Sequence, residues 1–292
     1  MSDDRLKMTS KPLLAAVIAA GLVSTVAVLW PALGAPAAKR APIPDLGTAD
    51  LGWTKIADDF QAPASGPGPV SFEKARPYIP NNDRGVQVTV RIADVSNPIL
   101  KPWVVEQMKK ANVEADAGRS AFEARASCWP GGVPGFLVMG RVNPMYFVQS
   151  PKEVLMINEG GPEIRHILMD VPHSANPKPS WYGESVGHYE NSDTLVVDTI
   201  GFNDKSFVDN YRTPHTNQLH VVERFKLVDD GKTLQVSFTV DDPGAFNMPW
   251  SAGQVYHRDH EGTLIEEICA ENNNVVLDAA VGPIPEAEKP DF

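Results

Sequence analysis

The sequence is poor in cysteine and in positive charge. Two of its 292 residues are cysteines, aromatic residues make up 8%, and 26 Lys and Arg stand against 37 Asp and Glu, giving a formal net charge of -11. A partner with a phosphate backbone requires clustered cations, so the acidic balance argues against nucleic-acid binding. The chain also lacks a phosphate-cradling glycine loop and a dinucleotide fingerprint, and we expect no cofactor.

Hydrophobic residues are abundant enough for a sizeable core. They make up 42% of the chain against 22% charged residues, a balance typical of folded proteins rather than disordered ones. Length alone allows two domains, but all-β barrels and sandwiches often form one unit of this size. We therefore expect one main domain.

The first residues are typical of an export signal. Arg5, Lys7 and Lys11 precede an uncharged stretch over 13–30, and small residues suited to a signal-peptidase site follow. The stretch is just long enough to span a bilayer, so residues 1–37 are either a signal peptide or an uncleaved anchor. Both alternatives predict a periplasmic or otherwise exported body, whose membrane contact would run only through that anchor.

The two cysteines, Cys128 and Cys269, lie far apart in the sequence. In an oxidising compartment they predict a structural disulfide, because closing so long a loop removes conformational entropy from the unfolded chain. Two buried thiols are the alternative. A nucleophilic cysteine is disfavoured, since neither position has the basic setting that activates a thiol.

Two different patterns precede the strands. Residues 38–95 are rich in Pro, Gly, Ala and Asp, which is typical of a tether or wrapping arm. Over 97–118 the apolar residues fall near one helical face, and Pro102 suits a helix start, so one amphipathic helix is predicted. The remaining domain, over 96–292, comprises this helix and a β structure.

From Met145 onward the apolar residues recur with a period of two, which predicts about nine short strands. The predicted strands are 145–149, 154–158, 165–169, 185–190, 194–202, 219–227, 233–240, 253–258 and 264–269. Residues 229–231, Asp-Asp-Gly, mark the clearest hairpin, because the Asp-Gly step supplies the positive φ angles of a tight turn.

Sequential strands with short turns favour a sheet that closes on itself and so removes its edges. We predict a mainly β fold, an antiparallel lipocalin-like (calycin-type) β-barrel with one N-terminal amphipathic helix. A barrel of that size holds one small ligand in its mouth. A two-sheet sandwich is the alternative.

Residues 183–187 match the G-x-S-x-G pattern of α/β-hydrolases around Ser185, and Asp204 and His215 follow in the right order. The nucleophile of that pattern lies on a strand-to-helix turn, whereas 188–200 alternates like a strand and hairpin. We therefore favour a structural interpretation in which the two glycines permit close packing.

Seven histidines raise the question of a metal site. His257 and His260 are three apart on a predicted strand and would face opposite sides, whereas a chelating pair on a strand needs a spacing of two. Other histidine pairs would converge only through tertiary structure. We expect no metal site.

The densest group of polar residues lies between Asp198 and Glu223. Each alternates in phase with apolar residues of its strand, so both carboxylates are expected to face the apolar side, where they need partners. With His215 and Asp204 they form a candidate catalytic set. His215 would transfer protons, Asp204 or Asp198 would orient it, and burial would keep Glu223 partly protonated.

The alternative to this acid–base set is a structural network. In it, Glu223 pairs with Arg224 or Arg165, and His215 caps a turn. Ion-pair networks inside barrels resemble active sites in sequence, so both interpretations stay open at this point.

Large side chains beside Pro or Gly mark the loop ends where a barrel would open. We expect them to line an apolar ligand-binding mouth, and packing that closes the barrel end is the alternative. The candidate ligand-binding residues are Trp181, Tyr182, Phe202, Arg224 and Trp250.

Several motifs follow one another in a specific order over about 128–274. They are PSWYGESVGHYE at 179–190, DTLVVDTIGFND at 193–204, Pro214-His215, Glu223-Arg224-Phe225, Asp241-Asp242-Pro243 and Cys269-Ala270-Glu271-Asn272-Asn273. This order resembles a large family of exported, largely uncharacterised bacterial proteins. The resemblance implies an exported bacterial protein and assigns no activity.

These patterns lead us to expect an exported, cofactor-independent enzyme that acts by acid–base chemistry, as a lyase, isomerase or hydrolase. Its substrate would be a small hydrophobic aromatic, terpenoid or steroid-like molecule. One alternative is a non-catalytic periplasmic carrier of a hydrophobic ligand, in which the same polar groups orient the guest. Another is an envelope interaction protein that uses the Pro-rich arm as a tether.

Overall fold

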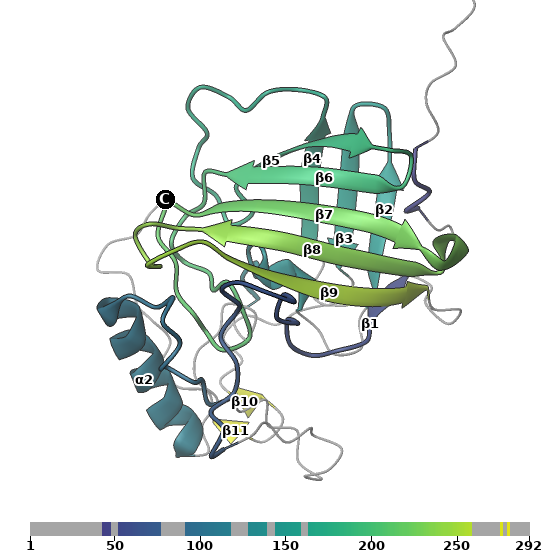
Figure 1. The fold of residues 1–292 in the computed structure, drawn as a ribbon. Coiled ribbons are helices and arrows are strands. Elements are labelled where there is room, and N and C mark those ends of the chain that lie inside the picture. The colour runs from purple at the N-terminus through teal and green to yellow at the C-terminus, as the bar shows by residue number, and fades with distance from the viewer. Residues whose placement is uncertain are drawn as a thin grey trace, which may run out of the picture. The chain divides into compact units, whose positions relative to one another are not determined.

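A computed structural model gives the fold of the protein (Figure 1). It describes residues 43–47, 52–76, 91–117, 128–138, 144–158, 163–258, 275–276 and 279–280. The expected signal or anchor over 1–37, the predicted strand over 264–269 and Cys269 lie outside the described residues. The export signal and the disulfide with Cys128 therefore stay predictions. None of the helices in the described ranges is long and apolar enough to cross a membrane.

The described strands form a closed barrel in which spatial neighbours follow chain order. Each strand from β1 to β9 pairs with the next, and β9 pairs with β1. The strands are β1 (Trp53–Lys55), β2 (Met145–Gln149), β3 (Glu153–Asn158), β4 (Glu163–Met169), β5 (Glu184–Glu190), β6 (Thr194–Ile200), β7 (His220–Val228), β8 (Thr233–Asp241) and β9 (Trp250–Arg258). A separate pair is formed by β10 (Val275–Val276) and β11 (Ala279–Ala280). The predicted mainly β barrel is confirmed.

One neighbouring pair of the barrel is parallel. Ile167 of β4 lies opposite Ser185 of β5, and both strands run in the same direction, whereas the other barrel pairs are antiparallel. Strand direction must alternate around an all-antiparallel ring, so a ring of nine strands requires a parallel pair. The long connection over 170–183 permits it, because it returns the chain to the end of the sheet where β4 began. The expectation of a purely antiparallel barrel is wrong.

The barrel interior is filled by alternate side chains of its strands. In β4, Arg165 and Ile167 are buried and the residues between and beside them are exposed, as the pleat of a one-sided sheet requires. Phe147 of β2 and Phe225 of β7 meet edge to face, with ring centroids 5.8 Å apart. Burying one such side chain contributes roughly 2 kcal/mol, so the barrel interior is the main hydrophobic core.

The barrel is closed by a segment that we predicted to be part of the arm over 38–95. Trp53 of β1 is fully buried, and its indole N–H donates to the carbonyl of Leu46 at 3.0 Å. The guanidinium of Arg258, in the neighbouring strand β9, lies 4.7 Å from the centre of the Trp53 ring. Part of the arm therefore belongs to the barrel rather than to a separate tether.

After β1 the chain runs along the edge of β9. Gln61 and Gly253 exchange two backbone hydrogen bonds of 2.9 Å, and the amide of Ser251 donates to the carbonyl of Pro67 at 3.1 Å. We call residues 56–67 the strap. It continues the line of β1 along β9 and is fixed there by backbone hydrogen bonds.

The predicted helix and hairpin are both present. The helix is α2 (Pro102–Asp116), with Pro102 in the first turn, where a missing N–H leaves no helical bond unmade. Val104 and Met108, one turn apart, are fully buried. At the β7–β8 turn, Asp230 and Gly231 have φ angles of 52° and 78°, as the Asp-Gly step predicts. A short 3-10 helix covers Gly135–Leu137.

Replacing Trp53 by Ala tests whether β1 closes the barrel. We expect Trp53→Ala to lower the free energy of unfolding by about 3–5 kcal/mol, because removal of a fully buried indole leaves a cavity at the seam. Urea denaturation followed by circular dichroism measures the change. Thr54→Ala, on the same strand and half-exposed, should cost less than about 1 kcal/mol. Equal losses in the two variants would contradict this role.

Candidate functional site

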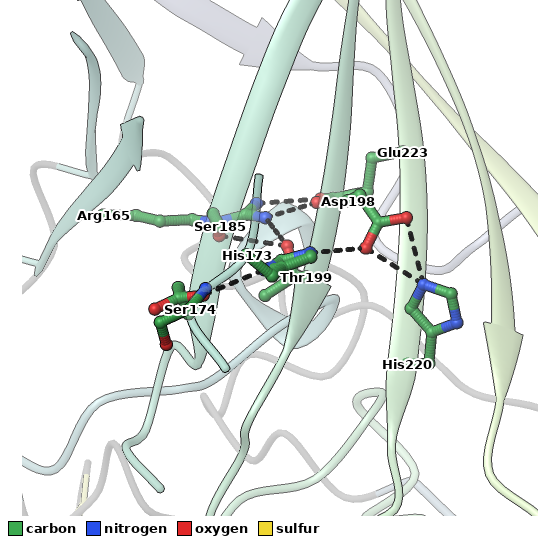
Figure 2. Close-up of polar contacts among 9 residues, drawn as sticks. Arg165, His173, Ser174, Ser185, Asp198, Thr199, His220 and Glu223 are labelled. Carbon is green, nitrogen blue, oxygen red and sulfur yellow. Dashed lines mark hydrogen bonds and ion pairs between the residues drawn. The ribbon is translucent and has the colours of Figure 1, made fainter. Parts of the chain in front are cut away.

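Two polar clusters lie on opposite faces of β6 (Figure 2). Successive side chains of a strand point to opposite sides, so Thr199 faces the barrel interior while Asp198 faces outward. Thr199 is fully buried, whereas the side chain of Asp198 is 39% exposed. We call the two groups the inner and the outer cluster.

The inner cluster is built around a buried ion pair. The guanidinium of Arg165 donates to both oxygens of Glu223, at 2.9 and 2.5 Å, and both side chains are fully buried. Arg165 also donates to the hydroxyls of Ser185 at 3.1 Å and Thr199 at 2.8 Å. Buried charges require such pairing, because removal from water without partners costs several kcal/mol.

This geometry favours the structural interpretation of Glu223. The residue faces inward as predicted, and it pairs with Arg165, which was one of the two partners considered. Ser185 lies within strand β5, bonded to Arg165 and Thr199. It is not on a strand-to-helix turn, so the hydrolase pattern lacks its structural context. A Cβ at Gly187 would lie 2.8 Å from a methyl group of Ile167, in keeping with close packing at this glycine.

The outer cluster joins two histidines through one carboxylate. Asp198 accepts from Nε2 of His173 at 2.9 Å and from Nε2 of His220 at 3.1 Å. Nδ1 of His173 bonds Glu184 at 3.1 Å, and the backbone amide of Ser174 donates to the same carboxylate at 2.7 Å. Hydrogen bonds from Ser174, and next from His173, hold the pKa of Glu184 below its usual value.

Asp198 faces outward, contrary to our expectation. The expected phase follows Val196 and Ile200, which share its face, but the fully buried apolar residues of β6 are Leu195 and Val197, on the same face as the fully buried Thr199. Val196 faces outward but is only 6% exposed, so in the sequence it cannot be told from a residue of the barrel interior. Apolar residues on both faces of one strand made the phase ambiguous.

The outer cluster fixes the hydrogen-bonding partners of both imidazoles. His173 lies between two carboxylates, with Nδ1 at Glu184 and Nε2 at Asp198. His220 donates from Nε2 to Asp198, which leaves Nδ1 as the basic nitrogen. No hydrogen bond from the described residues engages this Nδ1, and the His220 side chain is 42% exposed. An oriented, accessible base is thereby formed.

His215 occupies a different place, inside the loop between β6 and β7. Its Nδ1–H donates to the carbonyl of Thr216 at 3.0 Å, and its Nε2 accepts from the hydroxyl of Ser206 at 2.9 Å. Asp242 in turn accepts from the amide of Thr216 at 2.6 Å. Burial lowers the pKa of His215, which favours this neutral form. Asp204 is exposed, and no hydrogen bond among the described residues joins it to His215.

The four residues of the predicted catalytic set therefore lie in three surroundings, and only Asp204 is near His215, where burial lowers the imidazole pKa and the charge of Asp204 raises it by less. Glu223 belongs to the inner cluster, Asp198 to the outer cluster, and His215 to a buried loop network, with Asp204 at the surface. The sequence pattern missed His173 and Glu184, because the long connection over 170–183 brings His173 to β6 only in the folded chain.

The candidate ligand-binding residues are also dispersed. Phe202 and Trp250 are 0% and 1% exposed and are packed in the core, which favours the alternative of a closed barrel end. Trp181 is half-buried and its ring lies 5.6 Å from that of Trp129. The ring of Tyr182 meets another aromatic ring of the core edge to face. Arg224 alone lies on the outer face of β7, beside an open groove.

This groove, of about 370 Å³, lies on the outer face of β7, β8 and β9. Residues 61–63 of the strap line it, together with Val222, Thr239 and Ser251. Val222 is opposite Asp198 on β6 and opposite Thr239 on β8, and it follows His220 by two residues on the same face. The outer cluster therefore borders the groove, whose volume is in the range of small-molecule sites.

Neither a family model nor a curated protein matches the chain. Within the described ranges, no group of three or more His, Cys, Asp or Glu side chains is arranged to hold a metal ion.

The loop between β6 and β7 contains a buried carboxyl group that is sensitive to pH. Asp209 accepts from the amides of Tyr211 at 2.8 Å and Thr213 at 3.1 Å, and from the hydroxyl of Thr213 at 2.7 Å. Burial raises the pKa of Asp209 to about 6, against the opposing effect of these hydrogen bonds, and the charge of Asp59 adds to the rise. The folded protein therefore binds the proton of Asp209 more tightly than the unfolded chain does.

The inner ion pair predicts strong coupling between its two members. Arg165→Met or Glu223→Leu alone should lower the free energy of unfolding by about 3–5 kcal/mol, because each leaves one charge buried without its partner. The double variant should recover most of this loss, since an apolar pair leaves no uncompensated charge. A double-mutant cycle by urea denaturation measures the coupling, and additive losses would contradict it.

Asp209 predicts a stability that falls as pH rises from about 4 to about 6. Over this window the unfolded carboxyl loses its proton and the folded one keeps it, so its contribution is largest below pH 4 and lost above pH 6. Asp209→Asn keeps an acceptor for the two amides and does not ionise. It should gain on the wild type as pH rises, by up to roughly 3 kcal/mol. Unfolding free energies measured at several pH values test this, and a pH-independent difference would refute it.

Proposed function

We propose that the protein is an exported, cofactor-independent enzyme that moves protons in a small, mostly apolar molecule bound in the outer groove. His220 is the base, and Asp198 is the carboxylate that orients it. The single observation that carries this proposal is the 3.1 Å contact between Nε2 of His220 and the carboxylate of Asp198. It lies on the outer face of β6 and β7, beside a groove of about 370 Å³. A carboxylate that fixes the tautomer of an accessible imidazole is a recurrent device of acid–base catalysis.

The chemistry follows from the hydrogen bonds of the two residues. Nδ1 of His220 takes a proton from a substrate carbon, and the electron pair of that C–H bond becomes a new double bond to the neighbouring carbon. That carbon at the same time loses its bond to a leaving group, or its existing π pair moves to the far atom of an adjacent C=O or C=C bond. The Asp198 carboxylate stabilises the resulting imidazolium. In isomerisation the proton returns at another carbon, in elimination it goes to the leaving group, and in hydrolysis the base acts on water instead. His173, fixed between Asp198 and Glu184, is a positioning residue for the carboxylate.

Two features support the substrate class and the type of barrel. The groove contains apolar surface from Ala62, Pro63 and Val222, which suits an aromatic, terpenoid or steroid-like body. The chain-order pairing of β1 to β9 is in keeping with a lipocalin-like barrel, modified at one parallel pair. The proposed site is nevertheless on the outer face, because the inward side chains of the strands are packed together as the core.

The proposal predicts deuterium uptake by substrate carbons. The purified protein is incubated in D₂O with mixtures of apolar aromatic, terpenoid and steroid compounds. The mass of each recovered compound is then measured by mass spectrometry. We expect at least one compound to gain mass or convert. His220→Asn should slow this by about 100-fold or more, and Asp198→Asn by about 100- to 10,000-fold, because the imidazole loses its oriented tautomer.

His166→Asn is the matched control, since His166 also pairs with a carboxylate, Glu153 at 2.6 Å, on the outer face of β4 away from the groove. This variant should react like the wild type. Turnover that survives in His220→Asn would remove His220 from the mechanism. Retention of a compound without exchange or conversion would instead favour the carrier hypothesis.

A further inference from the structure

One charged side chain lines the outer groove. Among its described lining residues, Arg224 is the only one that carries a charge, and it is a cation in a chain of net charge -11. Its side chain is 46% exposed, on the same outer face of β7 as His220 and Val222. A guanidinium that lines a small-molecule groove is suited to pair with an anionic group of a ligand there.

The present partner of Arg224 is easily exchanged. Its guanidinium pairs with Glu190 of β5, and both side chains are substantially exposed. Exposed ion pairs contribute little to stability, because water and salt screen them. Glu190 also bonds Nε2 of His188 at 3.3 Å, so it keeps a partner when Arg224 turns to a ligand. A guanidinium offers two parallel N–H groups, which match a carboxylate.

The spacing along β7 places the cation and the base at two ends of one site. Arg224 follows His220 by four residues on the same face, which separates their Cα atoms by roughly 13 Å. Val222 lies between them and offers apolar surface. The hydroxyls of Thr239 and Ser251, on the neighbouring strands, are hydrogen-bonded to each other at 3.0 Å. A ligand that covers them therefore needs no polar group of its own between the carboxylate and the reactive carbon.

We infer that Arg224 binds a carboxylate of the substrate, and that the substrate class is small organic carboxylates with an apolar body. The carboxylate lies at Arg224, the apolar body covers Val222, and the acidic C–H points toward His220. The placement of the reactive end rests on the proposed function, whereas the preference for a carboxylate rests on the groove alone.

Binding of matched pairs of probes tests the inference. Cinnamate, 3-phenylpropionate and 2-naphthoate are compared with their primary amides, which have nearly the same shape and no charge. Nuclear magnetic resonance of isotope-labelled protein follows the Arg224 Nε–H and the amides of Val222 and Thr239. We expect at least one carboxylate to shift these signals and to bind about tenfold or more tightly than its amide.

Variants separate a specific contact from a general field. Arg224→Gln should reduce the preference to within about twofold, and Arg224→Lys should keep part of it, since a point charge lacks the fork geometry. Lys226→Gln is the matched control, because Lys226 is an exposed cation on the same face that does not line the groove. Its preference should equal that of the wild type.

Several results would overturn the inference. They are the absence of any shift of the Arg224 signals with all three carboxylates, equal binding of acid and amide, or a preference that survives in Arg224→Gln. The binding experiment is repeated with His220→Asn, because carboxylate binding at Arg224 does not depend on turnover by His220. Carboxylate preference without deuterium exchange would keep the Arg224 site and reject the acid–base enzyme, whereas exchange without such preference would do the reverse.

Discussion

Closure of nine strands into a ring is the constraint from which the candidate site follows. An odd ring needs a parallel pair, and a parallel pair needs a connection long enough to travel the length of the sheet. Here that connection is 170–183, and it carries His173 and Ser174 onto the outer face of β6 and β5. A short hairpin turn between β4 and β5 would not reach the outer face of β6. The same requirement that completes the core thus brings a second imidazole to Asp198.

Strand alternation divides the polar residues of β6 and β7 between two tasks. The inward-facing Thr199 and Glu223 satisfy Arg165 in a dry interior, where hydrogen-bonded pairing is required and movement is restricted. Asp198 is adjacent to Thr199 in the sequence, and His220 is three residues from Glu223. Asp198 and His220 nevertheless face outward and are accessible to solvent. Polar residues that are close together in the sequence of one strand therefore differ in role, because successive side chains of a strand point to opposite faces.

Local sequence predicted the parts of the fold that depend on local interactions. The alternation of β8, the Asp-Gly turn and the helix around Met108 were all recognisable, and Glu223 was placed on the correct face. The three-residue strand β1 was missed, because it lies in a Pro- and Gly-rich segment and exists only through its pairing with β9. The parallel pair and the groove were missed for a related reason: both arise from contacts between segments far apart in the chain.

The strap makes the groove a late product of folding. One wall comes from residues 61–63, and the facing floor includes Ser251 and Gly253, near the start of β9, the last barrel strand in the chain. Loop closure over so large a sequence separation is slow and is rewarded only when both partners are formed. A chain still lacking β9 has no groove at all, however complete β2 to β8 are. Ligand recognition at this site would therefore report that the start of β9 has paired with both β8 and the strap.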